Sequence, residues 1–73
     1  MKVEYDPVRD PLYLAFNSEA KAAETVTVKP GVHVDFDAKG RLIGLEILDA
    51  SEVLGGKVQF EVELAAPQPA GTM

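Results

Sequence analysis

The chain has 73 residues, of which 47% are hydrophobic and 26% are charged, and its formal net charge at pH 7 is −5. This length supplies one small domain, because a second hydrophobic core would have too few residues. The scattered Lys and Arg residues argue against nucleic-acid binding, which needs basic groups gathered on one face, and the absence of cysteine excludes disulfides and thiolate metal sites.

A period-two alternation of apolar and polar residues predicts a hairpin near the N-terminus. Residues 2–5 ("KVEY") and 12–16 ("LYLAF") have this pattern and predict the first two strands. The sequence "DPVRDP" between them holds two Asp-Pro pairs, which are typical of a turn. We therefore interpret Asp6 and Asp10 as turn residues, in preference to a pair of catalytic carboxylates.

The middle of the chain predicts a second set of strands. A polar stretch, "NSEAKAAE", is loop-like, and β-branched residues then predict a strand at 25–29. Pro30 and Gly31 end that strand. Residues 32–37 and 42–48 then predict a hairpin around the turn "DAKG".

The register of this central hairpin stays open at the sequence level. A bulged three-residue turn would pair Asp37 with Arg41 and place Val34 opposite Gly44. A two-residue turn would place Val34 opposite Leu45. Turn chemistry favours the first register and burial favours the second, and a slip of one residue moves every side chain to the other face.

A short helix is predicted after the central hairpin. The sequence "DASEVLGG" offers Asp49 and Ser51 as competing N-caps, with Glu52 at the spacing of a capping box. Gly55 would end the helix after little more than one turn. Helix capping thus accounts for residues that could be mistaken for part of a hydrolase site.

The predicted fold is α+β and mostly β: an antiparallel meander sheet of five to six strands, with one short helix between the last two strands. The last strand is predicted at 57–64, where "KVQFEVEL" alternates almost without error. We expect one compact domain at 1–65. Residues 66–73 ("APQPAGTM") predict a disordered C-terminal tail.

Such a sheet has more apolar surface than its helix can cover. Six strands span about 25 Å at their usual spacing, whereas a helix is only about 10–12 Å wide. The sheet must curl into a half-barrel or pack against a second copy, and the strand predicted at 57–64 could also pair edge to edge with a partner's strand. We favour a homodimer. The interface candidates are the apolar strand positions Val34, Leu45, Val58, Phe60 and Val62.

No catalytic signature is present, so we expect a protein that is not an enzyme and needs no cofactor. His33, Asp35 and Asp37 are weak metal candidates, because imidazole and carboxylate suit zinc or manganese. Neighbouring side chains on one side of a strand, however, stand roughly 6.8 Å apart at their bases. The turn also explains Asp37, and we therefore favour a solvated strand face. Tyr5 and Tyr13 are interpreted as core or interface aromatics.

Two stretches, "YDPVRDPLYL" (5–14) and "GVHVDFDAKGRLIGLEILDAS" (31–51), resemble the small bacterial and archaeal proteins of domain of unknown function 2283. The shared features are the Tyr-Asp-Pro opening, the Leu-Tyr pair, the Val-Asp-x-Asp hairpin and the Glu-Ile-Leu-x-Ala-Ser exit. The resemblance covers about residues 3–54. It implies a compact β-rich domain with a short helix and supplies no established activity and no catalytic residues.

The resemblance also implies an alternative role, because some relatives occur beside small toxin-like proteins. This chain departs from the family pattern at Pro11, at His33, where an aliphatic residue is common, and at 57–64, which extend past the shared region. Three functions follow. The favoured one is a self-associating interaction module whose acidic face could dock a basic protein; the alternatives are an antitoxin-like partner of a small basic toxin and a metal or small-ligand protein using His33, Asp35 and Asp37.

The sequence also bears on location. The segment "MKVEYDPVRD" lacks the apolar region of a signal peptide. No apolar run approaches the roughly 18 residues of a membrane helix. We therefore expect a cytoplasmic protein without a membrane partner.

Overall fold

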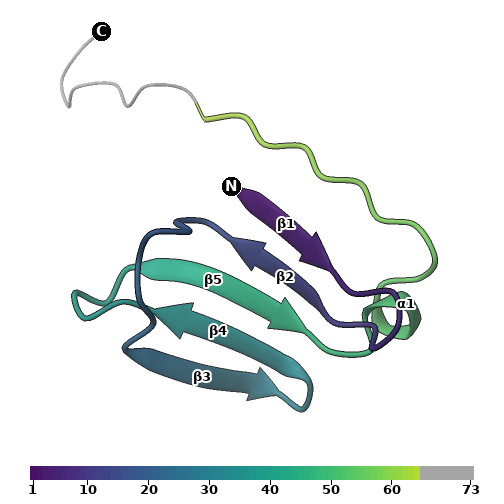
Figure 1. Cartoon of the computed structure of the whole chain (residues 1–73), viewed down its shortest axis with the longest axis horizontal. Helices are drawn as coiled ribbons and strands as arrows, with labels where there is room; N and C mark the ends of the chain where they lie inside the picture. The colour runs from purple at the N-terminus through teal and green to yellow at the C-terminus, as the bar shows by residue number, and fades with distance from the viewer. Residues whose placement is uncertain (65–73) are drawn as a thin grey trace, which may run out of the picture.

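The computed structural model describes residues 1–64, and these form one antiparallel sheet of five strands with one short helix (Figure 1). The predicted fold class, a small and mostly β structure of the α+β type, is confirmed. The predicted tail at 66–73 lies outside the described residues. The elements are β1 (Lys2–Tyr5), β2 (Leu12–Ala15), β3 (Glu24–Lys29), β4 (Val32–Phe36), β5 (Leu42–Ile47) and α1 (Ala50–Val53).

The strands are arranged in the order β1-β2-β5-β4-β3, and every neighbouring pair is antiparallel. The first hairpin, β1-β2, therefore joins a three-stranded meander through the contact between β2 and β5. Residues 16–23 connect β2 in the interior of the sheet to β3 at its far edge (Figure 1). This arrangement leaves β1 and β3 as the two edge strands.

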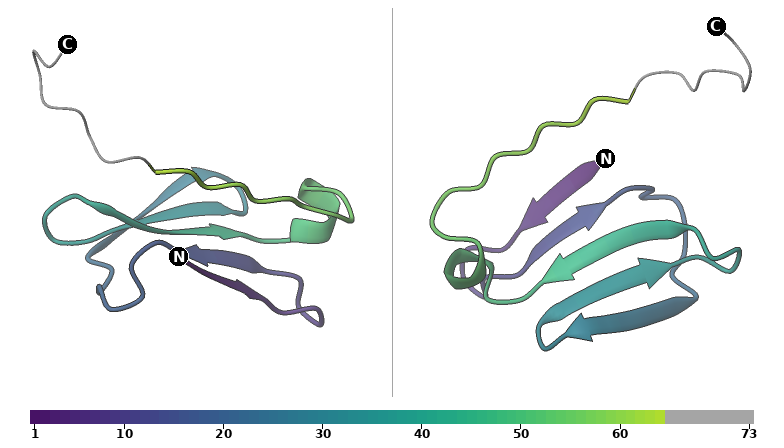
Figure 2. Two further views of the ribbon diagram at one scale, coloured as in Figure 1. Left: turned by 90° about the horizontal axis from the view of Figure 1, so that it is seen from above. Right: turned by 180° about the vertical axis from the view of Figure 1, so that it is seen from behind.

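The strand predicted at 57–64 is not part of the sheet, and this prediction was wrong. The segment leaves α1 in an extended path, passes outside β1 and stays on the side of the sheet that carries α1 (Figures 1 and 2). The helix thus follows the last strand and does not lie between the last two. The chain leaves α1 through Gly55, whose φ of +83° is left-handed, a conformation that glycine adopts readily.

The central hairpin combines the two registers that the sequence left open. At the turn, the N–H of Asp37 donates to the carbonyl of Arg41 at 2.9 Å, as a bulged three-residue turn requires. Farther along, Val34 lies opposite Leu45, as the other register predicted. A β-bulge with Ile43 as the extra residue of β5 joins the two parts. The bulge lets the turn keep its preferred chemistry while the apolar residues stay on one face.

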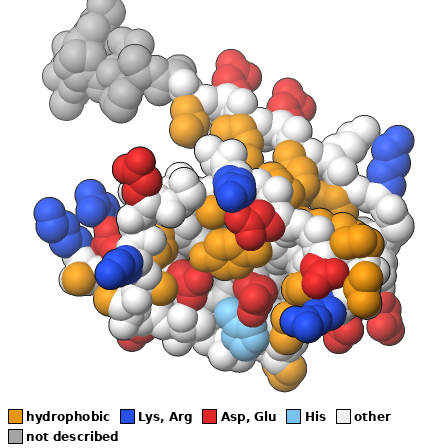
Figure 3. Space-filling model, viewed as in Figure 1, with side chains coloured by type: hydrophobic (Ala, Val, Ile, Leu, Met, Phe, Trp, Pro, Cys, Tyr) orange, Lys and Arg blue, Asp and Glu red, His pale blue; other side chains and the backbone are white. Residues whose placement is uncertain are grey.

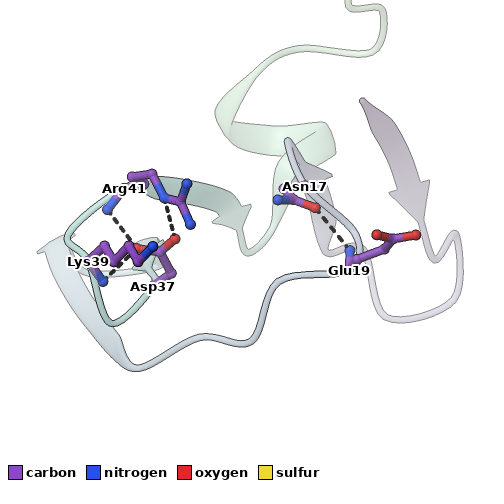
Figure 4. A network of polar contacts seen from close by, with 5 residues as sticks. All are labelled: Asn17, Glu19, Asp37, Lys39 and Arg41. Atoms are coloured by element: carbon purple, nitrogen blue, oxygen red, sulfur yellow. Dashed lines mark hydrogen bonds and ion pairs between the residues drawn. The ribbon is translucent and has the colours of Figure 1, made fainter.

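The carboxylate of Asp37 holds this turn together (Figure 4). It accepts hydrogen bonds from the backbone N–H groups of Lys39 and Arg41, each at 2.9 Å, and from the Arg41 Nε at 2.8 Å. The backbone hydrogen bond from Arg41 is the main reason that the pKa of Asp37 lies below its usual value. The Asn17 side chain closes another turn in a similar way, by accepting from the N–H of Glu19. Asp37 is therefore a turn residue.

Strand alternation and register separate the two faces of the sheet. The apolar face is formed by the row Val3, Leu14, Leu45, Val34 and Val26 and the row Tyr5, Leu12, Ile47 and Val32. The polar face is formed by the row Glu4, Tyr13, Glu46, His33 and Thr27 and the row Lys2, Ala15, Gly44, Asp35 and Thr25.

The hydrophobic core is small because the molecule has one layer of sheet and little to cover it. The buried residues are Leu12, Leu14, Ala15, Ile43 and Ala50, and no side chain within residues 1–64 is completely buried. Helix α1 lies against one end of the sheet (Figure 2). No helix in the described part of the chain has the length and apolar character needed to cross a membrane.

Candidate functional site

The polar face is organised around a tyrosine that crosses a neighbouring strand. Tyr13 on β2 reaches over Gly44 on β5, and its hydroxyl donates to Asp35 on β4 at 2.8 Å. A Cβ atom at residue 44 would overlap with the Tyr13 hydroxyl. The glycine in the middle of an apolar strand thus leaves room for the aromatic ring, which covers the exposed backbone at this position.

The other polar side chains of this face are also paired. Thr25 donates to the second carboxylate oxygen of Asp35 at 2.6 Å, and the hydroxyl of Thr27 lies 2.9 Å from the His33 Nδ1. Figure 3 shows this face, with acidic side chains near the only histidine of the chain. Burial, followed by the hydrogen bond to Asp35, raises the pKa of Tyr13 to about 12. These contacts tie β2, β3 and β4 together.

The three metal candidates do not converge on one point. His33 and Asp35 share the polar face, as predicted, but each is bound to a threonine of β3. Asp37 belongs to the turn at the end of the strand. Within residues 1–64, no group of three His, Cys, Asp or Glu side chains is placed to hold a metal ion. The geometry therefore favours a structural role for these residues.

A second polar cluster joins the first hairpin to the helix. The carboxylate of Asp10 accepts from the Ser51 N–H at 3.1 and 3.2 Å and from the Ser51 hydroxyl at 2.6 Å. It also accepts from the Tyr5 hydroxyl at 2.5 Å, and its backbone carbonyl accepts from the Ala50 N–H at 2.9 Å. Asp10 adopts a left-handed conformation, with φ of +73°, to make these contacts. Asp10 thus caps a helix that begins 40 residues later in the chain.

The predicted capping of α1 was wrong. Asp49 occupies the N-cap position but makes no side-chain capping bond, and Ser51 bonds with Asp10 instead. The hydrogen bond from the Ser51 hydroxyl, and then that from Tyr5, hold the pKa of Asp10 below its usual value. The hydrogen bond to Asp10 is also the main cause of a raised pKa for Tyr5. Sequence spacing could not find this cap, because the two partners are distant along the chain.

The apolar face carries a shallow cavity of about 200 Å³ beside α1. This volume is below the roughly 300–1,000 Å³ of typical small-molecule sites. Its lining is mainly apolar and includes Tyr5, Leu12, Ala50, Leu54, Val58 and Phe60. The cavity is the place where the start of the 57–64 segment rests on the sheet.

The five interface candidates fall into two groups. Val34 and Leu45 lie opposite each other in the middle of the apolar face and are half-buried. Val58 and Phe60 line the cavity, and Val62 extends beyond it with 62% of its surface exposed. All five therefore lie on the side of the molecule that carries the apolar face and α1.

The comparisons with known proteins agree with the sequence motifs. Residues 2–51 match a protein family described as "Protein of unknown function (DUF2283)". No curated protein and no solved structure matched the chain. The matched region contains all five strands and ends within α1, before the 57–64 segment.

Proposed function

The chain belongs to the DUF2283 family, and we propose that it is a non-enzymatic cytoplasmic module that associates with a second copy of itself through the apolar face of its sheet. One observation carries the proposal: the apolar face spans all five strands, and within residues 1–64 its edge side chains Val3, Tyr5 and Val26 stay largely exposed although Leu12 and Leu14 in its interior are buried. A sheet in a stable domain normally buries its apolar face against a second layer. Within residues 1–64, the chain supplies one short helix for this purpose.

The exposure of the apolar face increases toward its edges. Leu14 in the interior is 8% exposed, whereas Val3 on β1 and Val26 on β3 are 46% and 41% exposed. Exposed apolar side chains that gather on one face can mark interaction sites in folded proteins. The edge residues therefore have the most surface to lose when a partner covers the sheet.

The charge distribution is compatible with two copies meeting face to face. Glu4, Asp35 and Glu46 belong to the polar face, so they would point outward in such a dimer. Two stacked sheets lie about 10 Å apart, with their inner side chains in contact. A two-fold axis would use the same apolar face of both copies, as most homodimers do.

Sedimentation equilibrium over a wide concentration range tests this proposal. We expect a reversible monomer–dimer equilibrium. A monomer at every concentration would contradict self-association. Co-purification with a small basic protein, and no homodimer, would instead support the antitoxin-like alternative.

A further inference from the structure

We infer that residues 57–64 of one copy add to the free edge of β3 in the second copy, so that the two chains exchange these segments reciprocally. The inference rests on the proposed self-association and identifies the part of the partner that completes each sheet. It assigns a role to the segment that the alternation predicted as a strand and that the chain's own sheet leaves out.

The segment has the properties of a strand without a neighbour. It is extended, and its four apolar side chains alternate with Lys57, Gln59, Glu61 and Glu63. None of its backbone groups forms a hydrogen bond with the sheet in the described structure. Amphipathic strands of this kind recognise an open sheet edge through backbone hydrogen bonds and alternate side chains.

Contact between the segment and its own chain falls steadily along its length. Val58 is 40% exposed and Phe60 47%, whereas Val62 is 62% and Leu64 91% exposed. Val58 and Phe60 line the cavity beside α1, whereas Val62 is mostly exposed and Leu64 has almost no covering surface. The far half of the segment therefore offers apolar surface to another molecule.

The height of the segment above the sheet points to a second copy. Figure 2 shows the segment on the side that carries α1, displaced from the level of β1 and β2. A second sheet packed on the apolar face would lie about 10 Å above the first, on that same side. The segment is thus displaced from its own β1 and toward the level of the partner sheet.

The direction of the strands selects β3 of the partner as the acceptor. The segment returns from α1, so it runs antiparallel to its own β1 and passes outside it (Figure 1). A two-fold axis along the strands would place the partner's β3 above this β1. The partner's β3 would then run antiparallel to the segment, which is the more stable pairing. The alternative axis, across the strands, would offer only a parallel pairing with the partner's β1.

The side chains of β3 match the segment. β3 has six exposed residues, whereas the other edge strand, β1, has four. Placing Val62 opposite Val26 brings apolar residues together on the inner side, and such cross-strand pairs stabilise a sheet. On the outer side Glu61 and Glu63 would face Thr27 and Thr25, which carry no charge.

The area of the interface also favours exchange. The face of a five-stranded sheet measures roughly 24 Å by 17 Å, so two such faces in contact bury on the order of 800 Å² in total. Stable interfaces begin at about 1,200 Å². The two exchanged segments would add a strand to each sheet and supply the missing contact area.

Engineered disulfides test the inference directly, because the chain has no cysteine of its own. We would mix differently tagged Val26→Cys and Val62→Cys proteins and oxidise them. A mixed disulfide between chains is expected, since opposed strand residues lie within disulfide range. Thr27→Cys is the matched control for Val26→Cys, because its side chain lies on the opposite face and should not couple.

Two cysteines introduced into the same chain distinguish exchange between copies from pairing of the segment with its own sheet. A Val3→Cys/Val62→Cys protein should form no disulfide within one chain. Efficient disulfide formation within that chain would show that the segment pairs with its own β1 and would overturn the inference.

Substitutions in the full chain separate this inference from the proposed function. Val62→Lys should raise the dimer dissociation constant at least tenfold, and Glu63→Lys, on the outer side, should change it less than threefold. If the wild type forms a dimer and Val62→Lys does not weaken it, the exchange is overturned but self-association stands. A wild-type monomer at all concentrations would overturn both.

Discussion

The hydroxyl of Tyr13 lies where a side chain at Gly44 would begin, so these two residues of adjacent strands form one structural unit. The ring crosses β5 because residue 44 has no Cβ, and this path brings the hydroxyl to Asp35 on the next strand. Three strands are linked by this contact. It also places an ionisable phenol where its environment disfavours the charged form.

Replacement of Gly44 by alanine should destabilise the fold. The new methyl group would force the Tyr13 ring away, and overpacking of this kind usually costs about 1–3 kcal/mol. Urea denaturation measures the change in the free energy of unfolding. Gly56→Ala is the matched control, because a Cβ there meets no atom within 4 Å. Equal stabilities of the two variants would contradict the steric role of Gly44.

Tyr13 should make the fold sensitive to alkali. Its pKa is raised to about 12 in the folded protein, from an ordinary value of 10.0. The stabilisation is therefore fully present below about pH 10 and is lost as the pH rises through about 12. The chain has two tyrosines and no tryptophan, so the absorbance of tyrosinate in a Tyr5→Phe variant reports Tyr13 alone. If Tyr13 in that variant ionised near pH 10, its pKa would not be raised and the prediction would be wrong.

Asp10 should stabilise the junction between the first hairpin and α1. Asp10→Asn replaces the carboxylate, which accepts hydrogen bonds from Tyr5 and Ser51, with an uncharged amide. We expect Tm to fall by about 5 °C, because this is the usual change when a domain of this size loses one stabilising hydrogen bond. Asp49→Asn is the matched control, since Asp49 is also left-handed but makes no capping bond. The two variants should differ clearly in thermal denaturation.

The same carboxylate should contribute to acid sensitivity. The pKa of Asp10 is below its ordinary value of 3.8 in the folded protein. Its stabilisation is thus present above that value and is lost as the pH falls through the lowered pKa. The Tm difference between wild type and Asp10→Asn should shrink below about pH 3.8. A difference that stays constant to the lowest pH would show that the charge is not involved.

Self-association should depend on the side chains that β3 presents on the apolar face of the sheet. Val26→Lys introduces a charge at the edge of the apolar face, whereas Thr27→Lys places the same charge on the polar face. We expect Val26→Lys to weaken dimerisation at least tenfold in sedimentation experiments, with only about 0.5 kcal/mol of change in folding stability. Thr27→Lys should leave dimerisation nearly unchanged. Equal effects of both variants would argue against the apolar face as the interface.

Added zinc or manganese should not stabilise the protein. His33 and Asp35 are held by threonines of β3, and Asp37 is held by its own turn. A bound metal would raise Tm with its concentration. A zinc-dependent rise in Tm that disappears in His33→Ala would revive the metal-binding alternative.

Local patterns were sufficient to locate most of the fold. Alternation, β-branched residues and turn signals together located the five strands, and turn chemistry assigned Asp37 its role, because all of these depend on residues that are neighbours in the chain. The sequence places Gly44 within the strand predicted at 42–48. It does not indicate that Tyr13 is the partner of Gly44, because no local rule states that β2 lies beside β5.

The sequence by itself determined where the five strands of the sheet lie and how side chains alternate within each strand, since these features depend on residues that are neighbours in the chain. Tertiary structure decided the rest: the bulge at Ile43 that joins two registers, the remote cap from Asp10, and the displacement of 57–64 from the sheet. Each of these depends on a partner distant in the chain. The free energy of such a contact is set by the surface that the partner presents, and local alternation carries no information about that surface.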